Sequence, residues 1–259
     1  MTDLDFDDPC VIFALGRESK AFRREFRPTQ RFPGAPCWAR FCGPAWLSVL
    51  VLETGVGAAR VERVLDWLFK APQLGIVPYR PQVVISAGFA GALDEQRRVG
   101  DIVLATEVTD PEKNHWPTTW PEELPAGEWR PPLHRGRLLS SAQMICTVED
   151  KRALGQQHDA VAVDMESAIV ARLCSQRRVP FACVRTISDD VNTPLSPRLT
   201  SLLRAGRVDP FRLTASVMLA PRLIAELWRL ARQTTRAGEQ LGKALGELLT
   251  LTLPYGDEL

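Results

Sequence analysis

Three acidic residues lie where apolar runs of the sequence end, in the segments "VAVDMESAIVARLC" and "FACVRTISDD". In the first segment, Asp164 and Glu166 stand where a short apolar run gives way to helical spacing. In the second, an apolar run ends in Ser188 and Asp189. Ligands of open α/β sheets gather at the carboxyl ends of strands. Carboxyl groups there can exchange protons with a substrate or accept hydrogen bonds from its hydroxyl groups.

Both segments also have a purely structural interpretation. Glu166 would fall in the first turn of a helix, where free backbone N–H groups and the macrodipole favour an anion. Asp189 is of a residue type that caps helices well, and a largely helical segment follows it. The residues taken alone leave both interpretations open, and Asp164 stays ambiguous.

Two glycine-containing segments follow apolar runs and are predicted to be turns. "LETGVGAARVERVL" reads as strand, turn and helix, but Arg60 stands where a dinucleotide fingerprint would have its third glycine. In "ISAGFAGALD", Gly88 and Gly91 would let the backbone approach a ligand closely. Either segment could equally be a tight turn without a ligand.

The composition is that of an ordinary globular protein and excludes several functional classes. Apolar residues make up 45% and charged residues 24%, and the net charge of +1 gives no electrostatic basis for binding nucleic acid or a membrane surface. The N-terminus lacks the pattern of a signal peptide, and no apolar run reaches the length of a membrane-spanning helix. We therefore expect a cytoplasmic protein.

Cysteine and histidine spacing predicts neither a disulfide framework nor a metal site. The six cysteines include no CxxC pair, and four of them fall in or beside apolar runs, as buried thiols of a reducing compartment do. The three histidines are scattered along the chain. We expect no metal and no cofactor.

Apolar, β-branched runs alternate with helical spacing, which predicts one α/β domain over residues 1–259 with a largely buried sheet. The expected strands are 10–15, 46–53, 82–88, 101–108, 160–164 and 181–188, and the expected helices are 58–70 and the segment after Glu166. Residues 111–133, with six prolines and three tryptophans, are predicted to form a long surface excursion and a candidate lid.

The C-terminal extension, residues 194–259, is predicted to be mostly helical. Around Trp228 an apolar stripe faces a row of charged residues, which is typical of a helix that packs on its own domain or on a second subunit. Contact of these helices with a membrane surface is the alternative.

Four motifs in one order resemble the nucleoside phosphorylase/nucleosidase family, and most closely its methylthioadenosine/S-adenosylhomocysteine nucleosidases. These motifs are "AGFAGAL", "RVGDIVLATEV", "VAVDMESAIVARLC" and "VPFACVRTISDD", and the resemblance covers roughly residues 10–190. It implies a phosphorylase-like three-layer α/β sandwich around a twisted mixed β-sheet, usually a dimer or higher oligomer. It also implies an enzyme that cleaves the N-glycosidic bond of a purine nucleoside.

The resemblance assigns roles by position. Glu166 would accept hydrogen bonds from the ribose hydroxyls, Asp189 would protonate the leaving purine at N7, and Glu18 in "ALGRESKAF" would position and activate the attacking water. The remaining substrate-binding residues implied are Met165 against the sugar, Ala90 and Gly91 in the base and sugar pocket, Met144 and Ile145 over the purine, and Phe89 and Ser188 beside them.

The chemistry explains these residue types. Loss of a purine leaves an oxocarbenium-like ribose and needs a protonated leaving group, so an acid near the base accelerates it by roughly 10²–10⁴-fold. An ionised carboxylate is an acceptor-only group and can take both ribose hydroxyl protons. These requirements favour the functional interpretation of Glu166 over the structural one.

Two departures from the family pattern affect the nucleophile and the base. Phe89 stands where the family has a hydroxyl residue that helps hold phosphate or water, and Met144 replaces an aromatic residue that usually stacks on the base. We expect hydrolysis of a 5′-modified adenosine, of the methylthioadenosine or S-adenosylhomocysteine type, with release of adenine.

Three alternatives stay open. The first is a phosphorylase in which Arg17, Arg60 or Arg185 clamps phosphate. The second, implied by the hopanoid-associated branch of the family, is removal of adenine from adenosylhopane. The third is a protein that binds a nucleoside without cleaving it.

Overall fold

The computed structural model describes residues 8–44, 47–70, 73–74, 77–124, 129–194 and 221–252, and side chains are described for all of these except 73–74, 77, 221–231 and 252. The strands are β1 Cys10–Phe13, β2 Pro28–Arg31, β3 Trp38–Cys42, β4 Val49–Glu53, β5 Gln73–Leu74, β6 Val77–Pro78, β7 Val84–Ala92, β8 Ile102–Thr109, β9 His115–Pro117, β10 Leu133–Ser140, β11 Ala162–Asp164 and β12 Phe181–Asp189. The helices are α1 Gly16–Ser19, α2 Phe22–Glu25, α3 Ala58–Leu68, α4 Val148–His158, α5 Ser167–Arg177 and α8 Pro221–Thr252.

A mixed sheet of ten strands runs through the molecule in the order β11-β10-β8-β12-β7-β1-β4-β3-β2, with β9 beside β8. The pairs β1–β4, β1–β7 and β7–β12 are parallel, whereas β8–β12 and β3–β4 are antiparallel. β11 also pairs with β7, so that β7, β12, β8, β10 and β11 form a closed ring. The closed ring brings the ends of β11 and β12, which carry the acidic motifs, next to β7 in the middle of the sheet.

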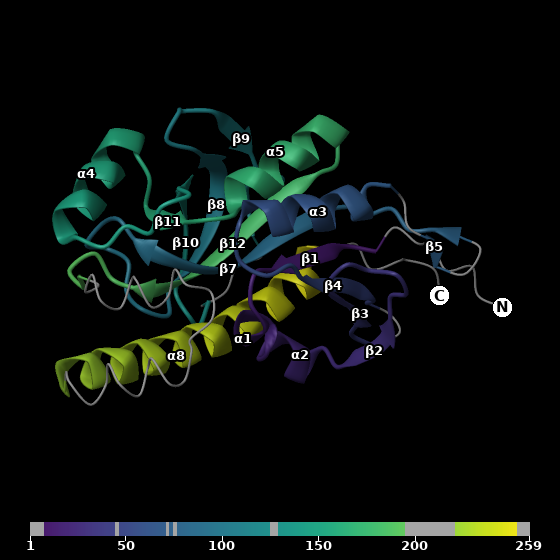
Figure 1. Cartoon of the computed structure of the whole chain (residues 1–259), viewed down its shortest axis with the longest axis horizontal. Coiled ribbons are helices and arrows are strands. Elements are labelled where there is room, and N and C mark those ends of the chain that lie inside the picture. Colours follow the sequence, from purple (N-terminus) through teal and green to yellow (C-terminus); the bar gives the residue numbers. More distant parts are fainter. Residues whose placement is uncertain are drawn as a thin grey trace.

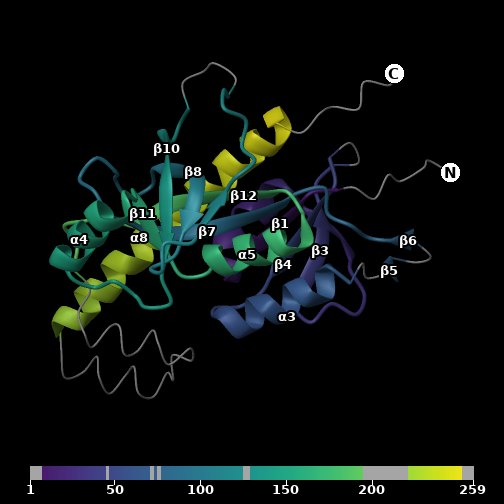
Figure 2. The ribbon, with the colours of Figure 1, turned by 90° about the horizontal axis from the view of Figure 1, so that it is seen from above.

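Helices cover both faces of the sheet. Helices α3 and α5 lie on one face, and α1, α2 and α8 lie on the other, where α8 runs diagonally along the sheet (Figures 1 and 2). Val61, Val64, Leu65 and Leu68 of α3 are fully or almost fully buried, as their spacing of three and four predicts. The three-layer α/β sandwich is therefore the architecture that the sequence predicts.

The six predicted strands all form, but the predicted turn after 88 does not. Residues Phe89–Ala92 continue β7, which pairs with β12 as far as Gly91 and with β11 at Gly91 and Ala92. Strands on both sides take up the backbone N–H and C=O groups of this segment, so a turn there would leave buried polar groups without partners. The glycines alone indicated a turn, because the pairing of this segment with distant strands cannot be predicted from the local sequence.

The Pro/Trp-rich excursion is fastened to the sheet. Residues His115–Pro117 form β9 beside β8, so part of the predicted surface excursion is paired with the sheet. A short edge strand tolerates proline. The Trp120 indole Nε1–H donates to the Cys183 carbonyl (2.8 Å), and the Thr119 N–H donates to the Phe181 carbonyl (2.8 Å). Of its described residues, 111–124 and 129–133, none lines the cavity described below, so the lid is not supported.

The C-terminal half of α8 belongs to the core. Leu241, Leu245 and Leu248 are fully buried, and a Cβ at Gly242 would lie 2.6 Å from the backbone N of Phe22, so only glycine permits this approach to α2. The apolar stripe around Trp228 lies in residues 221–231, outside the described side chains. Among the described residues, no helix is both long and apolar enough to cross a membrane.

Candidate active site

A cavity of about 240 Å³ opens where β7, β11 and β12 meet α1 and the start of α5. Among the described residues, four carboxyl groups line it: Glu18 of α1, Asp164 at the end of β11, Glu166 at the N-cap position of α5, and Asp189 at the end of β12. The other predicted substrate-binding residues also lie on its wall, namely Phe89, Ala90, Gly91, Met144, Ile145, Met165 and Ser188. The structure thus brings all of these residues together, while the role of each stays a prediction.

Asp189 is held by two side-chain donors. The Lys151 ammonium donates to Oδ2 (2.6 Å), and the Ser188 hydroxyl donates to Oδ1 (2.8 Å). A Cβ at Gly91 would lie 3.0 Å from Oδ2, so a glycine on β7 makes room for the carboxylate. Both oxygens therefore have fixed positions at the edge of the cavity.

Lys151 of α4 is a site residue that the sequence analysis missed. Its side chain is fully buried, and the ammonium also donates to the carbonyls of Asp190 (2.9 Å) and Thr193 (3.1 Å), which satisfies its three donors. Thr147 caps the helix by accepting from the Asp150 N–H. One feature of the sequence could have identified this residue: Lys151 lies on the same helical face as Leu154 and His158, where a core residue is expected.

Glu18 is buried and held by backbone donors. Its Oε2 accepts from the Leu15 N–H (2.8 Å) and its Oε1 from the Phe89 N–H (3.3 Å). Burial raises the pKa of this carboxyl, and the two N–H groups and the Arg185 charge partly offset that shift. A carboxylate whose pKa is raised is a stronger base than an ordinary one, which suits it to accept a proton from water.

Phe89 contributes through its backbone. The N–H of this residue orients Glu18, a contact that needs no particular side chain. The ring lies against α8, where a Cβ at Gly238 would be 3.7 Å from Phe89 Cζ. The loss of a hydroxyl at this position therefore leaves a donor to the carboxylate in place.

Glu166 carries the least compensated charge of the four carboxyls. Its Oε1 accepts from the Gly57 N–H at the start of α3 (3.3 Å). Burial, followed by the nearby Asp164 carboxylate, raises the pKa of Glu166 to about 7, while the Gly57 N–H and Arg185 act in the opposite direction. The group is thus poised between its two protonation states near neutral pH.

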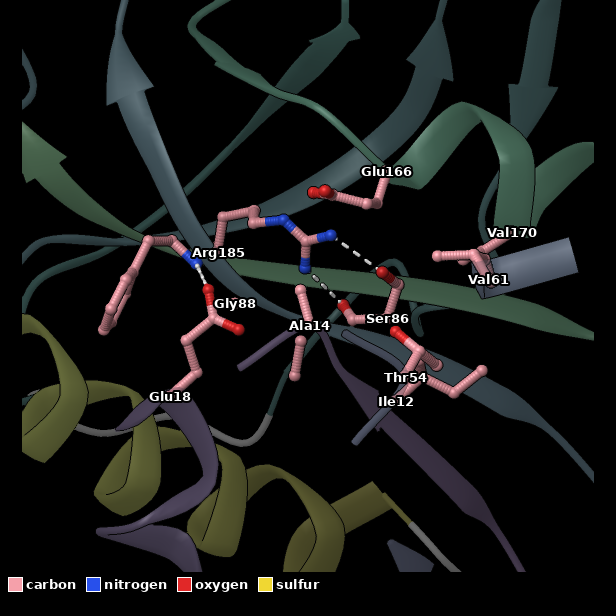
Figure 3. Close-up of a pocket in the computed structure, with 12 residues that line it drawn as sticks. Ile12, Ala14, Glu18, Thr54, Val61, Ser86, Gly88, Glu166, Val170 and Arg185 are labelled. Atoms are coloured by element: carbon pink, nitrogen blue, oxygen red, sulfur yellow. Dashed lines mark hydrogen bonds between the residues drawn. The ribbon is translucent and has the colours of Figure 1, made fainter. Parts of the chain in front are cut away.

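A small chamber of about 20 Å³ adjoins the cavity between Glu18 and Glu166 (Figure 3). Its polar wall also includes Thr54, Ser86 and Arg185. A space of about 10–15 Å³ that the centre of a water molecule can reach is enough to hold one water. The chamber therefore has room for about one water, which is too little for a phosphate ion.

Arg185 and Asp164 form a buried network behind the chamber. The guanidinium donates to Asp164 Oδ2 (2.7 and 2.9 Å), to the Ser86 hydroxyl (2.7 Å) and carbonyl (2.8 Å), and to the Ser167 hydroxyl (2.6 Å). It also donates to the Val184 carbonyl. These contacts use its five N–H groups, so Asp164 has a structural role and Arg185 has no donor left for phosphate.

Comparison with known proteins places these observations in a family. Residues 10–200 match the model of the phosphorylase superfamily. The 5′-methylthioadenosine/S-adenosylhomocysteine nucleosidase of Staphylococcus aureus (strain JH9) is 27% identical over 165 residues, which span 56% of this chain and 69% of that protein.

Solved structures share the fold. The 5′-methylthioadenosine/S-adenosylhomocysteine nucleosidase of Helicobacter pylori, in complex with an inhibitor, superposes with a TM-score of 0.67 at 16% identity, over 95% of this chain and 98% of that chain. The futalosine hydrolase of Helicobacter pylori gives a TM-score of 0.66 at 16% identity, over 95% of this chain and 98% of that chain. Both confirm the predicted α/β fold with its large mixed sheet.

Proposed function

Since the chain belongs to the phosphorylase superfamily, we propose that it hydrolyses the N-glycosidic bond of a 5′-modified adenosine and releases adenine. The observation that carries this proposal is the convergence of Glu18, Glu166 and Asp189 on one cavity beside a chamber with room for about one water. The name of the Staphylococcus aureus relative supports the same reaction class.

In the proposed reaction, the bond between C1′ and N9 breaks while a bond forms between C1′ and the water oxygen. Asp189, in its protonated form, gives a proton to N7, so adenine leaves as a neutral base and Lys151 stabilises the carboxylate that is left. Glu18 takes a proton from the water as it attacks. Glu166, in its ionised form, accepts hydrogen bonds from the 2′- and 3′-hydroxyls and holds the sugar between the two other carboxyls.

Water is favoured over phosphate as the nucleophile. The chamber beside Glu18 is too small for phosphate, and the donors of Arg185 are already used. Arg60 lines neither the cavity nor the chamber, and Arg17 lines the cavity but not the chamber beside Glu18. A phosphorylase would need several free donors around a larger space.

The first experiment incubates the purified protein with methylthioadenosine, S-adenosylhomocysteine and adenosine, with and without phosphate, and follows free adenine. We expect release at equal rates with and without phosphate. Release only in the presence of phosphate, together with a ribose 1-phosphate product, would establish a phosphorylase instead.

The two remaining alternatives have separate tests. Adenine release from adenosylhopane, with none from the three soluble nucleosides, would assign the hopanoid reaction. Calorimetric binding of an adenosine analogue without base release over long incubation would identify a non-catalytic binder.

We propose a homodimer on the sequence resemblance, and a cytoplasmic location on the cysteine pattern, which is typical of a reducing compartment. Light scattering of the purified protein measures the oligomer mass. A mass of one chain at micromolar concentration would exclude the dimer.

A further inference from the structure

A second cavity of about 410 Å³ lies between the α1–α2 segment and α8. Arg17 and Thr234 line both this side cavity and the active-site cavity, so the two spaces adjoin. The rest of its described wall comprises Lys20, Ala21, Arg24, Thr235, Gly238 and Glu239.

The side cavity concentrates positive charge in a protein that is almost neutral as a whole. Arg17, Lys20 and Arg24 contribute three cations, against the single carboxylate of Glu239, which lies 3.8 Å from Arg24. Among the described residues, neither Arg17 nor Lys20 has an ion-pair partner, whereas the neighbouring Arg23 pairs with Glu53 (3.2 Å). Among the described residues, Lys20 is therefore left without an opposite charge, and Arg17 acts on the buried Glu18 carboxyl without an ion-pair contact.

This arrangement is not what helix packing alone would produce. Positions 17, 20 and 24 fall on one face of the α1–α2 segment, where like charges repel one another by a few tenths of a kcal/mol per pair. Farther along α8 the same contact is closed, because Gly242 and the buried Leu245 fit against Phe22 and Phe26. At the open end α8 presents two threonines and a glycine, which leave the space unfilled.

The position of the side cavity identifies the part of a nucleoside that would reach it. In the proposed reaction the purine lies by Asp189, Met144 and Ile145, and the 2′- and 3′-hydroxyls face Glu166. The described wall without a role in this reaction comprises Ala14, Leu15, Arg17, Val56, Gln143, Val163 and Thr234, and of these only Arg17 and Thr234 also line the side cavity. From there the path leads past Arg17 into the side cavity.

We infer that the side cavity is a subsite for an anionic group on the 5′ substituent of the substrate, held by Arg17 and Lys20. The inference rests on the proposed function, because that function fixes the direction of the sugar. It assigns the substrate to 5′-modified adenosines that carry a carboxylate or a phosphate, and it disfavours a purely apolar 5′ group. Charge-assisted hydrogen bonds to such a group would strengthen binding on the order of 10–100-fold.

The test compares two matched pairs of substrates by the kcat/KM of adenine release. The carboxylate pair is 5′-(2-carboxyethylthio)-5′-deoxyadenosine and its uncharged amide, and the phosphate pair is adenosine 5′-monophosphate and adenosine. We expect the anion to be preferred by about tenfold or more in at least one pair. Preference in one pair alone identifies the anion, and no preference in either pair overturns the inference.

Variants locate the preference. Lys20→Gln should reduce the preference for the anion by about threefold or more while turnover of the uncharged partner changes by less than about twofold. Lys70→Gln, an exposed lysine just after α3, is the matched control and should leave the preference unchanged. An unchanged preference in Lys20→Gln would overturn the assignment to this cavity.

Failure of the subsite and failure of the proposed function give different results. Adenine release without a preference removes the subsite and keeps the function. If no compound releases adenine, calorimetry with the same pairs still tests the subsite. Tighter binding of the anionic compound than of its uncharged partner would keep the subsite and remove the function. Equal binding of the two, or no binding, would remove both.

Discussion

Asp189 and Glu166 face the same cavity, yet the protein stabilises their charges in opposite ways. Asp189 has a buried ammonium at 2.6 Å and a hydroxyl at 2.8 Å, so its negative charge is compensated. Glu166 has one backbone N–H at 3.3 Å, and burial beside Asp164 raises its pKa to about 7. In one cavity, therefore, one carboxylate stabilises the fold through its partner, and the other is costly to keep ionised.

The difference follows from the elements that carry the two residues. Asp189 ends β12, where α4 passes close enough to place Lys151 against it. Glu166 occupies the N-cap position of α5 but makes no capping hydrogen bond. Its side chain lines the cavity, where a substrate hydroxyl would be its next partner. We interpret Asp189 as a group preorganised beside the base, and Glu166 as a hydrogen-bond acceptor whose partners the sugar would supply.

The largest expected effect is on the rate, in Asp189→Asn. The amide has no acidic proton for N7, so adenine release should fall by roughly 10²–10⁴-fold. Asp190→Asn, its half-buried neighbour, is the matched control. Adenine release by Asp189→Asn at the wild-type rate, with the thermal transition intact, would remove Asp189 from the mechanism.

Lys151→Met should lower the free energy of unfolding by roughly 3–5 kcal/mol, because it leaves the Asp189 carboxylate buried without its partner. Urea denaturation measures this change. The double variant Lys151→Met/Asp189→Asn should be more stable than Lys151→Met alone, since the uncompensated charge is gone. Additive losses in the double variant would show that the two residues do not act as a pair.

Glu166→Gln should raise the free energy of unfolding, whereas Lys151→Met lowers it. A carboxyl whose pKa is raised from 4.5 to about 7 binds its proton more tightly in the folded state, so its contribution to stability is full below pH 4.5 and is lost as the pH rises through 7. At pH 8 the glutamine should therefore stabilise the protein by on the order of 3 kcal/mol.

The control for this stability change is the pH itself. At pH 4.5 the difference between Glu166→Gln and wild type should shrink to a few tenths of a kcal/mol, because the carboxyl is protonated in the folded state and half protonated in the unfolded state. Glu112→Gln, on an exposed residue, should show no pH-dependent difference. A Glu166→Gln variant that is less stable than wild type at pH 8 would mean that the Glu166 charge is compensated after all.

The smallest effect is a pH dependence of the wild-type rate. Glu166 must be ionised to accept hydrogen bonds from both ribose hydroxyls. We therefore expect kcat/KM to fall by about tenfold per pH unit below about pH 7 and to level off above it. A series from pH 5 to 8 with an uncharged substrate measures this limb. A flat profile over that range would show that the ionisation of Glu166 does not control kcat/KM.

Sequence patterns predicted the elements whose signal is local. Val61, Val64, Leu65 and Leu68 repeat with helical spacing, and β1, β4, β7, β8, β11 and β12 have apolar runs. Elements without such a signal were missed: β2 has four exposed residues, and β10 carries charged residues on half-buried positions. Helix α4 was missed although Thr147 caps it, because its apolar face is interrupted by Lys151.

The sequence by itself determined which residue types could cleave a glycosidic bond, because acids at the ends of apolar runs and four ordered motifs are local features. Tertiary structure alone decided how those acids are charged and held. Contacts such as Lys151 with Asp189, Gly57 with Glu166 and Phe89 with Glu18 join residues 38 to 109 positions apart. Burial and long-range hydrogen bonds set the charge of a carboxyl, and no spacing along the chain encodes either of them.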